Sequence, residues 1–548
     1  MGDGVVSDNG RTLHGELDRT ARSHPGQLLS FVNERVELRL DELCAQSRSM
    51  ALAMAESGVR RGDRVGLMLA NEPAFVISLV ALSRLGACAC PLSLPTSGRD
   101  GYADKVQGIL AAAGVRQVVV SRKLARLKSL LEQALAGVSQ IPADELAQGE
   151  AGEFPEVSGD DDLIVQFTSG STSRPKGVRL AHDNLLAGLD AIRLGVDLGR
   201  PGDRAGVWLP LFHDMGLVGM LAAVLTGIPV SIWSPSSFVK DPARWLREVS
   251  DGGHTACAMP NFAYDLLRQA VPAEEVPGYD LSRWRVAFNG AEPIAADSVA
   301  AFLAHFEPAG FRPEAMLPVY GLAEATLAVA FPPLGREPKV DWVDRVTLAE
   351  SAIAVPRDSA STGARPVVAL GSPVAGIEFR IADPKNDGVL GERRVGEVQV
   401  QGAPVTPGYV GTQEQPLTAD GWLRTGDLGY LAGGELHVTG RIKEMMIVRG
   451  VNYYPEDIEA LIRTDAEIYH RRCVAFIEGS DTAERIVLVA ETTVDDADER
   501  SRLRERLRAK VIAETGLEQL AVTLVGPNSI PRTSSGKLKR LDANRLVA

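Results

Sequence analysis

The sequence predicts an α/β fold: a large N-terminal domain of parallel sheets flanked by helices, a β-rich subdomain, and a small α+β C-terminal domain. Three observations support this prediction. Helical and extended patterns alternate over the first 330 residues, extended patterns with glycine turns dominate residues 367–411, and the two patterns mix again after Gly440. Alternation of the first kind is typical of parallel sheets covered by helices.

The first part of the chain supplies the expected parallel sheets. Apolar residues recur at helical spacing in residues 40–58 and 74–85, and an apolar run from Gly216 predicts another helix. Short apolar runs predict strands at residues 64–69, 87–94, 115–121, 163–167, 205–209, 229–233 and 285–289. Ligand-binding loops of such folds lie at the carboxyl ends of the strands, so functional residues are expected directly after these runs.

The residue composition and the secondary-structure pattern change from about residue 332 onward. Residues 332–366 are rich in Pro, Asp, Ser and Ala, which predicts a loop with short ordered pieces. Alternation around residues 376–381 and 396–400 predicts an antiparallel β-unit at about 367–439. A junction between two domains is expected near residues 440–444. After it, helices are expected at 457–462 and 499–515, and strands at 473–476 and 485–490. We therefore expect a large domain over residues 1–440 and a small domain over 441–548.

Composition narrows the class of protein. The 548 residues carry 58 Lys plus Arg against 71 Asp plus Glu, and a net charge of −13 argues against a nucleic-acid partner. There is no run of about 18 apolar residues, so no membrane span is expected. The five cysteines are scattered and odd in number, which favours reduced, buried thiols in a cytoplasmic protein.

The most informative segment is the loop at residues 167–177, FTSGSTSRPKG. A strand that leads into a loop of Gly, Ser, Thr and Lys is typical of a phosphate site, where backbone N–H groups, hydroxyls and a cation converge on an anion. It is not a Walker loop, because Lys176 precedes Gly177 instead of following it. An ordinary surface loop is the alternative.

Six further segments carry candidate chemistry. They are residues 208–217 (WLPLFHDMGL), 288–293 (FNGAEP), 319–326 (VYGLAEAT), 421–428 (GWLRTGDL, where the acid would end a strand), 440–444 (GRIKE) and 531–538 (PRTSSGKL). Each has a simpler explanation: a polar pair at a helix start, a core aromatic ring, helix-end charges, or a solvated basic tail.

Taken in this order, the segments resemble the adenylate-forming superfamily of acyl-activating enzymes over nearly the whole chain. Within it, the sequence is most similar to the fatty acyl-AMP ligases. Ser173 and Arg174 stand where most of the superfamily has Gly, residues 289–293 form the turn NGAEP, and residues 332–366 lie where that branch carries an extra segment. The resemblance implies the fold described above, with a mobile small domain.

The resemblance also implies roles for individual residues. The phosphates of ATP would be held by Thr168, Ser169, Gly170, Ser171, Thr172 and Lys176. The adenine site would be lined by Asn289, Gly290, Ala291, Glu292, Tyr320 and Gly321. Glu324 would bind Mg²⁺, Asp427 would accept hydrogen bonds from the ribose, and Arg441 would support the ribose and phosphates.

The remaining roles concern catalysis and the acyl group. Lys537 would stabilise the charge that builds between the carboxylate and the α-phosphate. His213, followed by Asp214, Met215 and Gly216, would lie at the entrance of the acyl pocket. Lys443 matches the hinge about which the small domain would turn.

The function implied is activation of a fatty or related carboxylic acid with ATP and Mg²⁺, followed by acyl transfer to the phosphopantetheine of an acyl carrier protein acting in trans. An acyl-CoA ligase and a stand-alone amino-acid adenylation enzyme are the alternatives, together with a catalytically inactive binding homologue. Asp214 is the acid near the acyl site that could hold a substrate ammonium.

Overall fold

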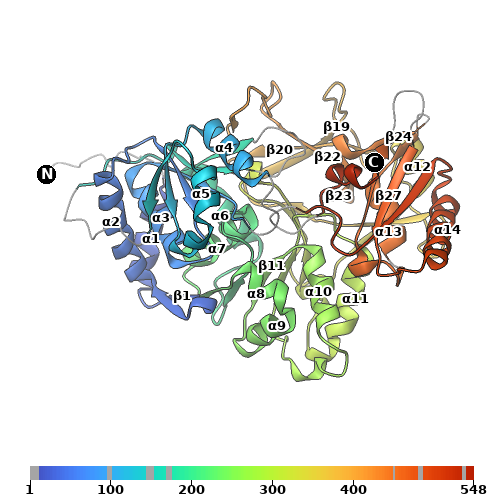
Figure 1. The fold of residues 1–548 in the computed structure, drawn as a ribbon, viewed down its shortest axis with the longest axis horizontal. Helices are drawn as coiled ribbons and strands as arrows, with labels where there is room; N and C mark the ends of the chain where they lie inside the picture. Colours follow the sequence, from blue (N-terminus) through green and yellow to red (C-terminus); the bar gives the residue numbers. More distant parts are fainter. Residues whose placement is uncertain are drawn as a thin grey trace.

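A computed structural model describes residues 11–95, 101–143, 153–167, 176–448, 451–463, 465–478, 485–532 and 538–547. Two seven-stranded sheets form the large N-terminal domain (Figure 1). The first has the order β13 (Met316–Pro318), β12 (Val286–Asn289), β11 (Ala256–Met259), β9 (Ala205–Val207), β10 (Val230–Ile232), β1 (Leu28–Phe31) and β2 (Val36–Arg39). All its neighbouring strands run parallel except the edge pair β1–β2.

The second sheet has the order β21 (Tyr409–Val410), β8 (Gly177–Ala181), β7 (Asp162–Phe167), β4 (Cys88–Pro91), β3 (Arg64–Met68), β5 (Gln117–Val120) and β6 (Ser139–Pro142). β8 pairs antiparallel with both β7 and β21, and the other pairs are parallel. The predicted parallel sheets are confirmed, with antiparallel strands added at their edges.

Helices fill the space between the two sheets. One hydrophobic cluster joins strands of both sheets to α1 (Leu13–Ser23), α2 (Leu40–Glu56), α3 (Pro73–Leu85), α6 (His182–Gly195) and α7 (Asp214–Thr226). α3 is mostly apolar, begins with Pro73 and is capped by Gly86 in the left-handed conformation. So apolar a helix must be buried, which explains its place in the centre of the domain, and its charged residue, Arg84, is paired with Asp18.

Further helices of the large domain cover outer faces. They are α4 (Tyr102–Ala113), α5 (Lys128–Ala134), α8 (Pro235–Lys240), α9 (Pro242–Asp251), α10 (Asn261–Ala270) and α11 (Ala296–Phe306). α8 to α11 surround a second core rich in Trp and Phe, in which Trp208 stacks on Phe238 with ring centroids 3.8 Å apart.

The predicted antiparallel unit is confirmed as a four-stranded sheet of β19 (Ile377–Ala382), β20 (Gly396–Gly402), β22 (Leu423–Ala432) and β23 (Glu435–Arg441). A smaller sheet of β14 (Tyr320–Gly321), β15 (Ala328–Phe331) and β18 (Ser372–Pro373) lies before it in the chain. Residues 332–366 are more ordered than the composition predicted: β16 (Val340–Asp344) and β17 (Ala364–Val368) form a hairpin that encloses α12 (Arg345–Ser351).

The small C-terminal domain is α+β, as predicted. β26 (Cys473–Glu478), β27 (Arg485–Glu491) and β28 (Leu520–Val525) form its sheet, and α13 (Pro455–Arg463) and α14 (Ala497–Thr515) share a core with it. A hairpin of β24 (Met446–Val448) and β25 (Val451–Tyr453) precedes α13. Short 3₁₀ turns complete the described chain, among them η6 (Ala323–Ala325), η7 (Ile442–Glu444), η8 (Tyr469–Arg471) and η9 (Leu541–Leu546).

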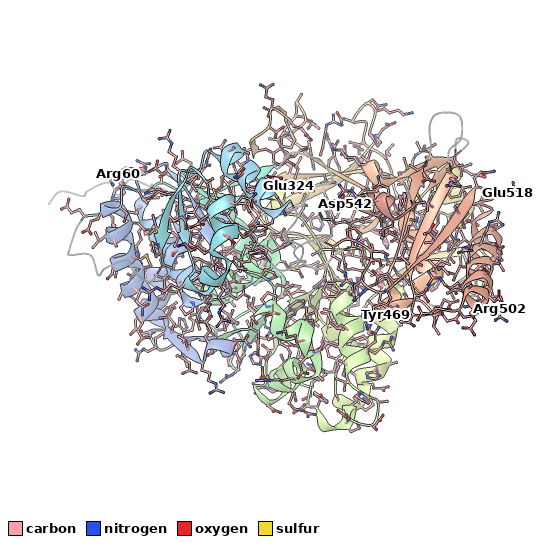
Figure 2. All side chains as sticks on the ribbon, viewed as in Figure 1. Arg60, Glu324, Tyr469, Arg502, Glu518 and Asp542 are labelled. Atoms are coloured by element: carbon pink, nitrogen blue, oxygen red, sulfur yellow. The ribbon has the colours of Figure 1, made fainter. Side chains whose placement is uncertain are left out.

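The small domain rests on α10 and α11 through the turn at η8. Arg471 Nη1 lies 3.2 Å from Asp265 Oδ1 and 3.2 Å from Asp297 Oδ2, and His470 Nδ1 lies 2.8 Å from Gln269 Oε1. Figure 2 shows Tyr469 at this boundary.

Two expectations from composition concern burial and membranes. All five cysteines are free and buried, as predicted. None of the helices in the described part of the chain has the length and apolarity that a membrane crossing requires.

Candidate active site

The predicted phosphate loop closes a β-hairpin. β7 ends at Phe167, β8 begins at Gly177, and these two residues pair across the antiparallel strands. Thr168, Ser169, Gly170, Ser171 and Thr172 lie outside the described residues. Gln166, just before the loop, donates from Nε2 to the Phe212 carbonyl at 2.9 Å and so ties the loop to the turn that carries His213.

Lys176, the last cation of the loop, is held by two residues from a distant part of the chain. Its ammonium forms an ion pair with the Glu414 carboxylate and lies 5.6 Å from the centroid of the Tyr409 ring. The Lys176 side chain is 19% exposed. A cation is thus fixed at the loop's end by a charge partner and an aromatic face.

Glu324 lies at η6, between the N-terminal elements and the small domain (Figure 2). Its Oε1 accepts a hydrogen bond from the Tyr409 hydroxyl at 2.8 Å, and its carbonyl accepts from the Thr406 N–H at 2.7 Å. Burial raises the pKa of Glu324, and the negative charge of Asp214 adds to that rise. A buried carboxylate of this kind gains stability when a cation approaches.

The fit of Mg²⁺ to this site follows from the donor set. Among the described residues, no group of three or more His, Cys, Asp or Glu side chains is arranged to hold a metal. Mg²⁺ is commonly bound by one or two carboxylates together with substrate phosphates, and does not need a cage made wholly of protein. Glu324 beside the phosphate loop satisfies that requirement.

The His213 segment forms the start of α7. His213 Nδ1 lies 2.5 Å from Asp214 Oδ1, and the same oxygen accepts from the Met215 N–H at 2.8 Å. Met215 is buried in the aromatic core around Trp208. At Gly216, an added Cβ would lie 2.3 Å from the Pro210 carbonyl oxygen, so the close turn itself requires glycine.

The turn after β12 contains the residues predicted to line an adenine site. Asn289 is fully buried, donates from Nδ2 to Asn261 Oδ1 at 3.3 Å, and has an Oδ1 with no hydrogen-bond partner. Ala291 has a φ of 66°, and Glu292 Oε1 accepts from the Phe262 N–H at 2.6 Å. Gly290 lies against Val319, so the turn approaches the strand that leads to Tyr320.

Tyr320 and Asp427 form a buried polar pair, which the largely exposed Arg441 joins from the surface. Tyr320 donates its hydroxyl to Asp427 Oδ2 at 2.6 Å, and Arg441 Nε lies 2.8 Å from Asp427 Oδ1. The Asp427 carboxylate raises the pKa of Arg441. Each carboxylate oxygen has two lone pairs, so Asp427 retains capacity to accept from a ligand hydroxyl.

Two details differ from the sequence-based expectations. Asp427 does not end a strand but lies inside β22, where the register shifts between Leu428 and Gly429. Gly321 allows close approach of the protein's own backbone: an added Cβ would lie 1.8 Å from the Leu327 carbonyl oxygen. The conformation of β14 therefore requires this glycine whether or not a ligand binds there.

The last two predicted residues belong to the hinge and the C-terminal loop. Lys443 lies in η7, and its charge helps Lys176 to lower the pKa of Glu414. Lys537 lies outside the described residues, but the residues on either side of its loop, Arg532 and Leu538, are joined by a β-bridge.

Three residues of the site escaped sequence analysis. Tyr409 and Glu414 contact Lys176 and Glu324 from a segment more than 80 residues away in sequence, and no local pattern marks them. The Asn71 side chain donates to the carbonyls of Leu209 and Trp233 at 2.9 and 2.8 Å, which supports the turn before His213.

Comparison with known proteins shows the family to which the chain belongs. Residues 17–410 match the family model of the AMP-binding enzymes, and residues 450–545 match that of the AMP-binding enzyme C-terminal domain. The chain is 34% identical to a Caulobacter vibrioides protein named "Putative acyl-CoA synthetase", over 97% of this chain and 94% of that one. It is 33% identical to a medium-chain-fatty-acid–[acyl-carrier-protein] ligase of Moorena producens, over 95% of this chain and 92% of that one.

Solved structures agree with the sequence relatives. A structure from a study of fatty acyl-adenylate ligases from E. coli and L. pneumophila superposes with a TM-score of 0.91 at 33% identity, over 98% of both chains. The family match covers both domains and most of the chain. The protein therefore belongs to the AMP-binding enzyme family of adenylate-forming ligases.

Proposed function

We propose that this protein converts a fatty or related carboxylic acid and ATP into an acyl-adenylate and pyrophosphate, and then transfers the acyl group to the phosphopantetheine thiol of an acyl carrier protein. In the first step a carboxylate oxygen bonds to the α-phosphorus, and the bond from that phosphorus to the bridging oxygen of pyrophosphate breaks. In the second step the thiolate sulfur bonds to the acyl carbon and AMP leaves.

The observation that carries the proposal is the polar group around Tyr409. The Tyr409 hydroxyl donates to Glu324, the Lys176 ammonium lies over the Tyr409 ring, and the positive charge of Arg441 acts on Glu324. A cation at the end of a phosphate loop, next to a buried carboxylate, suits a nucleotide triphosphate. Mg²⁺ held by Glu324 and the phosphates would neutralise charge on the departing pyrophosphate.

The other residues receive roles from their positions. Asp427 would accept hydrogen bonds from the ribose while Arg441 stays paired with its other side, and the turn from Asn289 to Glu292 would face the adenine. Asn289 Oδ1, which lacks a partner, is a buried acceptor of the kind that a bound base could satisfy after a small rearrangement. Lys537 would reach the α-phosphate when the small domain, which we place at residues 441–548, turns about Lys443.

The choice of a carrier protein as acceptor rests on residues 332–366, here named the insertion segment. Arg365 Nε lies 2.5 Å from Asp457 Oδ1 at the start of α13, and its guanidinium lies 4.7 Å from the Tyr454 ring centroid. Arg345 of the same segment lies 3.9 Å from Asp457. These buried contacts attach the small domain to the large one and oppose the rotation that a CoA-transferring orientation would need.

Two rival functions share the first step. An acyl-CoA ligase is favoured by the name of the Caulobacter relative. An amino-acid adenylation enzyme would need a free acid near the acyl site, and Asp214 is engaged by His213 and by the Met215 N–H. The fatty-acid function with a carrier acceptor accounts for both the insertion contacts and the engaged Asp214.

Pyrophosphate release across a panel of acids tests the proposed function. With ATP and Mg²⁺, saturated fatty acids of rising chain length should give a clear optimum, and amino acids should give background rates. Glu324→Gln, which keeps the side-chain shape but removes the charge, is the matched inactive control. Turnover of amino acids, or no fatty-acid-dependent release, would overturn the proposal.

A further inference from the structure

The predicted hinge lies between two ion pairs, one with the large domain and one with the small domain. On one side, Arg441 Nε is 2.8 Å from Asp427 Oδ1 in β22 of the large domain. On the other side, the Glu444 carboxylate is ion-paired with Arg540 of the small domain. Ile442 and Lys443 alone separate the two anchored residues in sequence. A rotation that preserves both pairs must therefore turn about the backbone of these two residues.

Arg540 also binds α13. Its Nε lies 2.8 Å from Glu459 Oε1 and its Nη2 lies 3.0 Å from Glu456 Oε1, while its side chain is 13% exposed. A guanidinium has five N–H donors in a planar fork and can bridge three carboxylates, which an ammonium on a flexible stem cannot do with the same geometry. Arg540 therefore fastens Glu444, at the end of the hinge turn, to the body of the small domain.

The same arginine follows the base of the loop that contains Lys537. The Lys539 N–H donates to the Pro531 carbonyl at 2.8 Å, and a β-bridge joins Arg532 to Leu538. Just before this base, the Asn528 and Ile530 N–H groups donate to the buried Glu491 carboxylate, each at 2.9 Å. The base of the loop is thus held on its first side by Glu491 and on its second side by Arg540.

We propose that Arg540 is a positioning residue that couples the hinge to the loop carrying Lys537, an inference that rests on the proposed function because it takes Lys537 as the residue that acts in adenylation. With Glu444 clamped to α13 and to the loop base, the chain from residue 444 onward turns as one body. Rotation about Ile442 and Lys443 then carries the base of the loop, at Pro531 and Leu538, to one defined position with the rest of that body. Without the contact between Glu444 and Arg540, the segment after the hinge yields and the loop base is delivered over a spread of positions.

The charges around Arg540 show how its contact with Glu444 can be removed without leaving Arg540 unpaired. Glu444, Glu456 and Glu459 face two guanidiniums, those of Arg540 and Arg463. Removing Glu444 leaves Arg540 paired with Glu459 and hydrogen-bonded to Glu456 of α13, so the buried guanidinium keeps partners. Glu444→Ala is the variant that separates the hinge from the loop without emptying the cluster.

The test compares Glu444→Ala with Lys539→Ala in the full-length protein. Lys539 lies in the same segment but is exposed and pairs with Asp542 at the surface. Pyrophosphate release with ATP and a fatty acid should fall about 10- to 100-fold in kcat for Glu444→Ala, with KM values and melting temperature unchanged, because geometry and not binding is lost. Lys539→Ala should behave like the wild type.

A double variant decides whether the clamp acts through Lys537. If it does, Glu444→Ala should add no further loss to Lys537→Ala, and Arg540→Lys should reproduce the defect of Glu444→Ala. A wild-type kcat for Glu444→Ala, an additive loss in the double variant, or a fall in kcat matched by a fall in melting temperature would overturn the inference. Wild-type adenylation by Lys537→Ala would instead refute the role of Lys537 in the proposed function.

Discussion

Tyr409 shows how a single side chain can join two parts of a site. Its hydroxyl donates to Glu324 and its ring faces Lys176, so the buried carboxylate and the cation at the end of the phosphate loop share one neighbour. Burial raises the pKa of both Glu324 and Tyr409, which keeps the hydroxyl a donor and the carboxylate in need of a positive partner. Nucleotide phosphates with Mg²⁺ would supply that partner.

Lys537→Ala tests the residue assigned to the transition state. We expect adenylation to fall by about 10²–10³ or more, because the charge that builds on the oxygens between carboxylate and α-phosphate loses its partner. Pyrophosphate release measures this, with the melting temperature as evidence that the protein stays folded. Near-normal adenylation by this variant would refute the assignment.

Substitutions of Asp427 and of Glu324 should impair different properties of the enzyme, ATP binding in the first case and Mg²⁺ dependence in the second. Asp427→Ala should weaken ATP binding, since the ribose loses an acceptor and Arg441 loses its charge partner. Glu324→Ala should mainly raise the Mg²⁺ concentration needed and slow the chemistry. Calorimetric ATP titration and Mg²⁺ dependence of the rate check both variants. Unchanged affinity in the first and unchanged Mg²⁺ dependence in the second would mean that these acids are structural.

At the scale of elements, the sequence predicts strands and helices that are marked by local pattern. The apolar runs at residues 64–69 and 163–167 became β3 and β7, and the helical spacing in residues 40–58 became α2. In residues 332–366, composition alone could not reveal the β16–β17 hairpin. Its stability comes from pairing between residues 20 to 28 positions apart and from packing against β22 and Tyr454.

The residues of the candidate site also fall into two groups, those marked by a local motif and those brought in by long-range pairing. Glu324, Asp427 and Arg441 stand in short motifs, so the sequence identified them, and the structure brings them together. Tyr409 contacts Glu324, and Glu414 contacts Lys176, only through the fold, when β21 pairs with the edge of β8 beside the phosphate loop. Such a long-range pairing leaves no periodic signal in the chain, and sequence analysis therefore missed it.

The insertion segment makes a prediction of its own at this scale. Arg365→Ala should remove the buried pair with Asp457, loosen the small domain, and raise the yield of acyl-CoA when free CoA is supplied. Arg357→Ala is the control, because Arg357 is more exposed and pairs with Asp344 inside the insertion segment. Thioester formation is measured by mass spectrometry. If Arg365→Ala and wild type yield equal amounts of acyl-CoA, the pair does not restrict the acceptor.

Point substitution is preferable to removing the insertion segment. Asp341 at its start accepts from the Tyr430 hydroxyl at 2.8 Å and pairs with Arg393 at 3.0 Å. Deleting residues 341–365 would leave these buried partners unsatisfied and destabilise β22 as well as free the small domain. A change in acceptor after such a deletion would have two causes.

For the whole molecule, two buried histidines, His182 and His254, and the half-buried His14 predict how stability depends on pH. Burial lowers the pKa of His14 to about 4, of His182 to about 3 and of His254 to about 4. In the unfolded chain these groups titrate near their ordinary pKa, so the unfolded state binds more protons as pH falls below about 6.5. The free energy of unfolding therefore keeps its full value above about pH 6.5 and decreases as pH falls toward about 4. The decrease at pH 5 is on the order of 2 kcal/mol per histidine.

Melting temperature measured between pH 7.5 and 5.0 checks this expectation. It should fall with pH, and less steeply in His182→Asn, whose amide oxygen can still accept the hydrogen bond from the Leu13 N–H. The exposed His24, changed to Asn, should leave the slope unaltered. Glu456 works in the opposite direction, because burial raises its pKa to about 8 and stability from this group falls as pH rises from about 4.5. A flat profile, or equal slopes for wild type and His182→Asn, would contradict the prediction.

The central claim, that the activated acyl group passes to a carrier protein and not to free CoA, is tested most directly by a comparison of acceptors. The protein is incubated with ATP, Mg²⁺ and its preferred fatty acid, and then with either CoA or a holo acyl carrier protein. The account predicts that acyl-adenylate accumulates in the presence of CoA and is consumed when the holo carrier is added. Efficient formation of acyl-CoA by the intact protein would contradict it and would identify the enzyme as an acyl-CoA ligase.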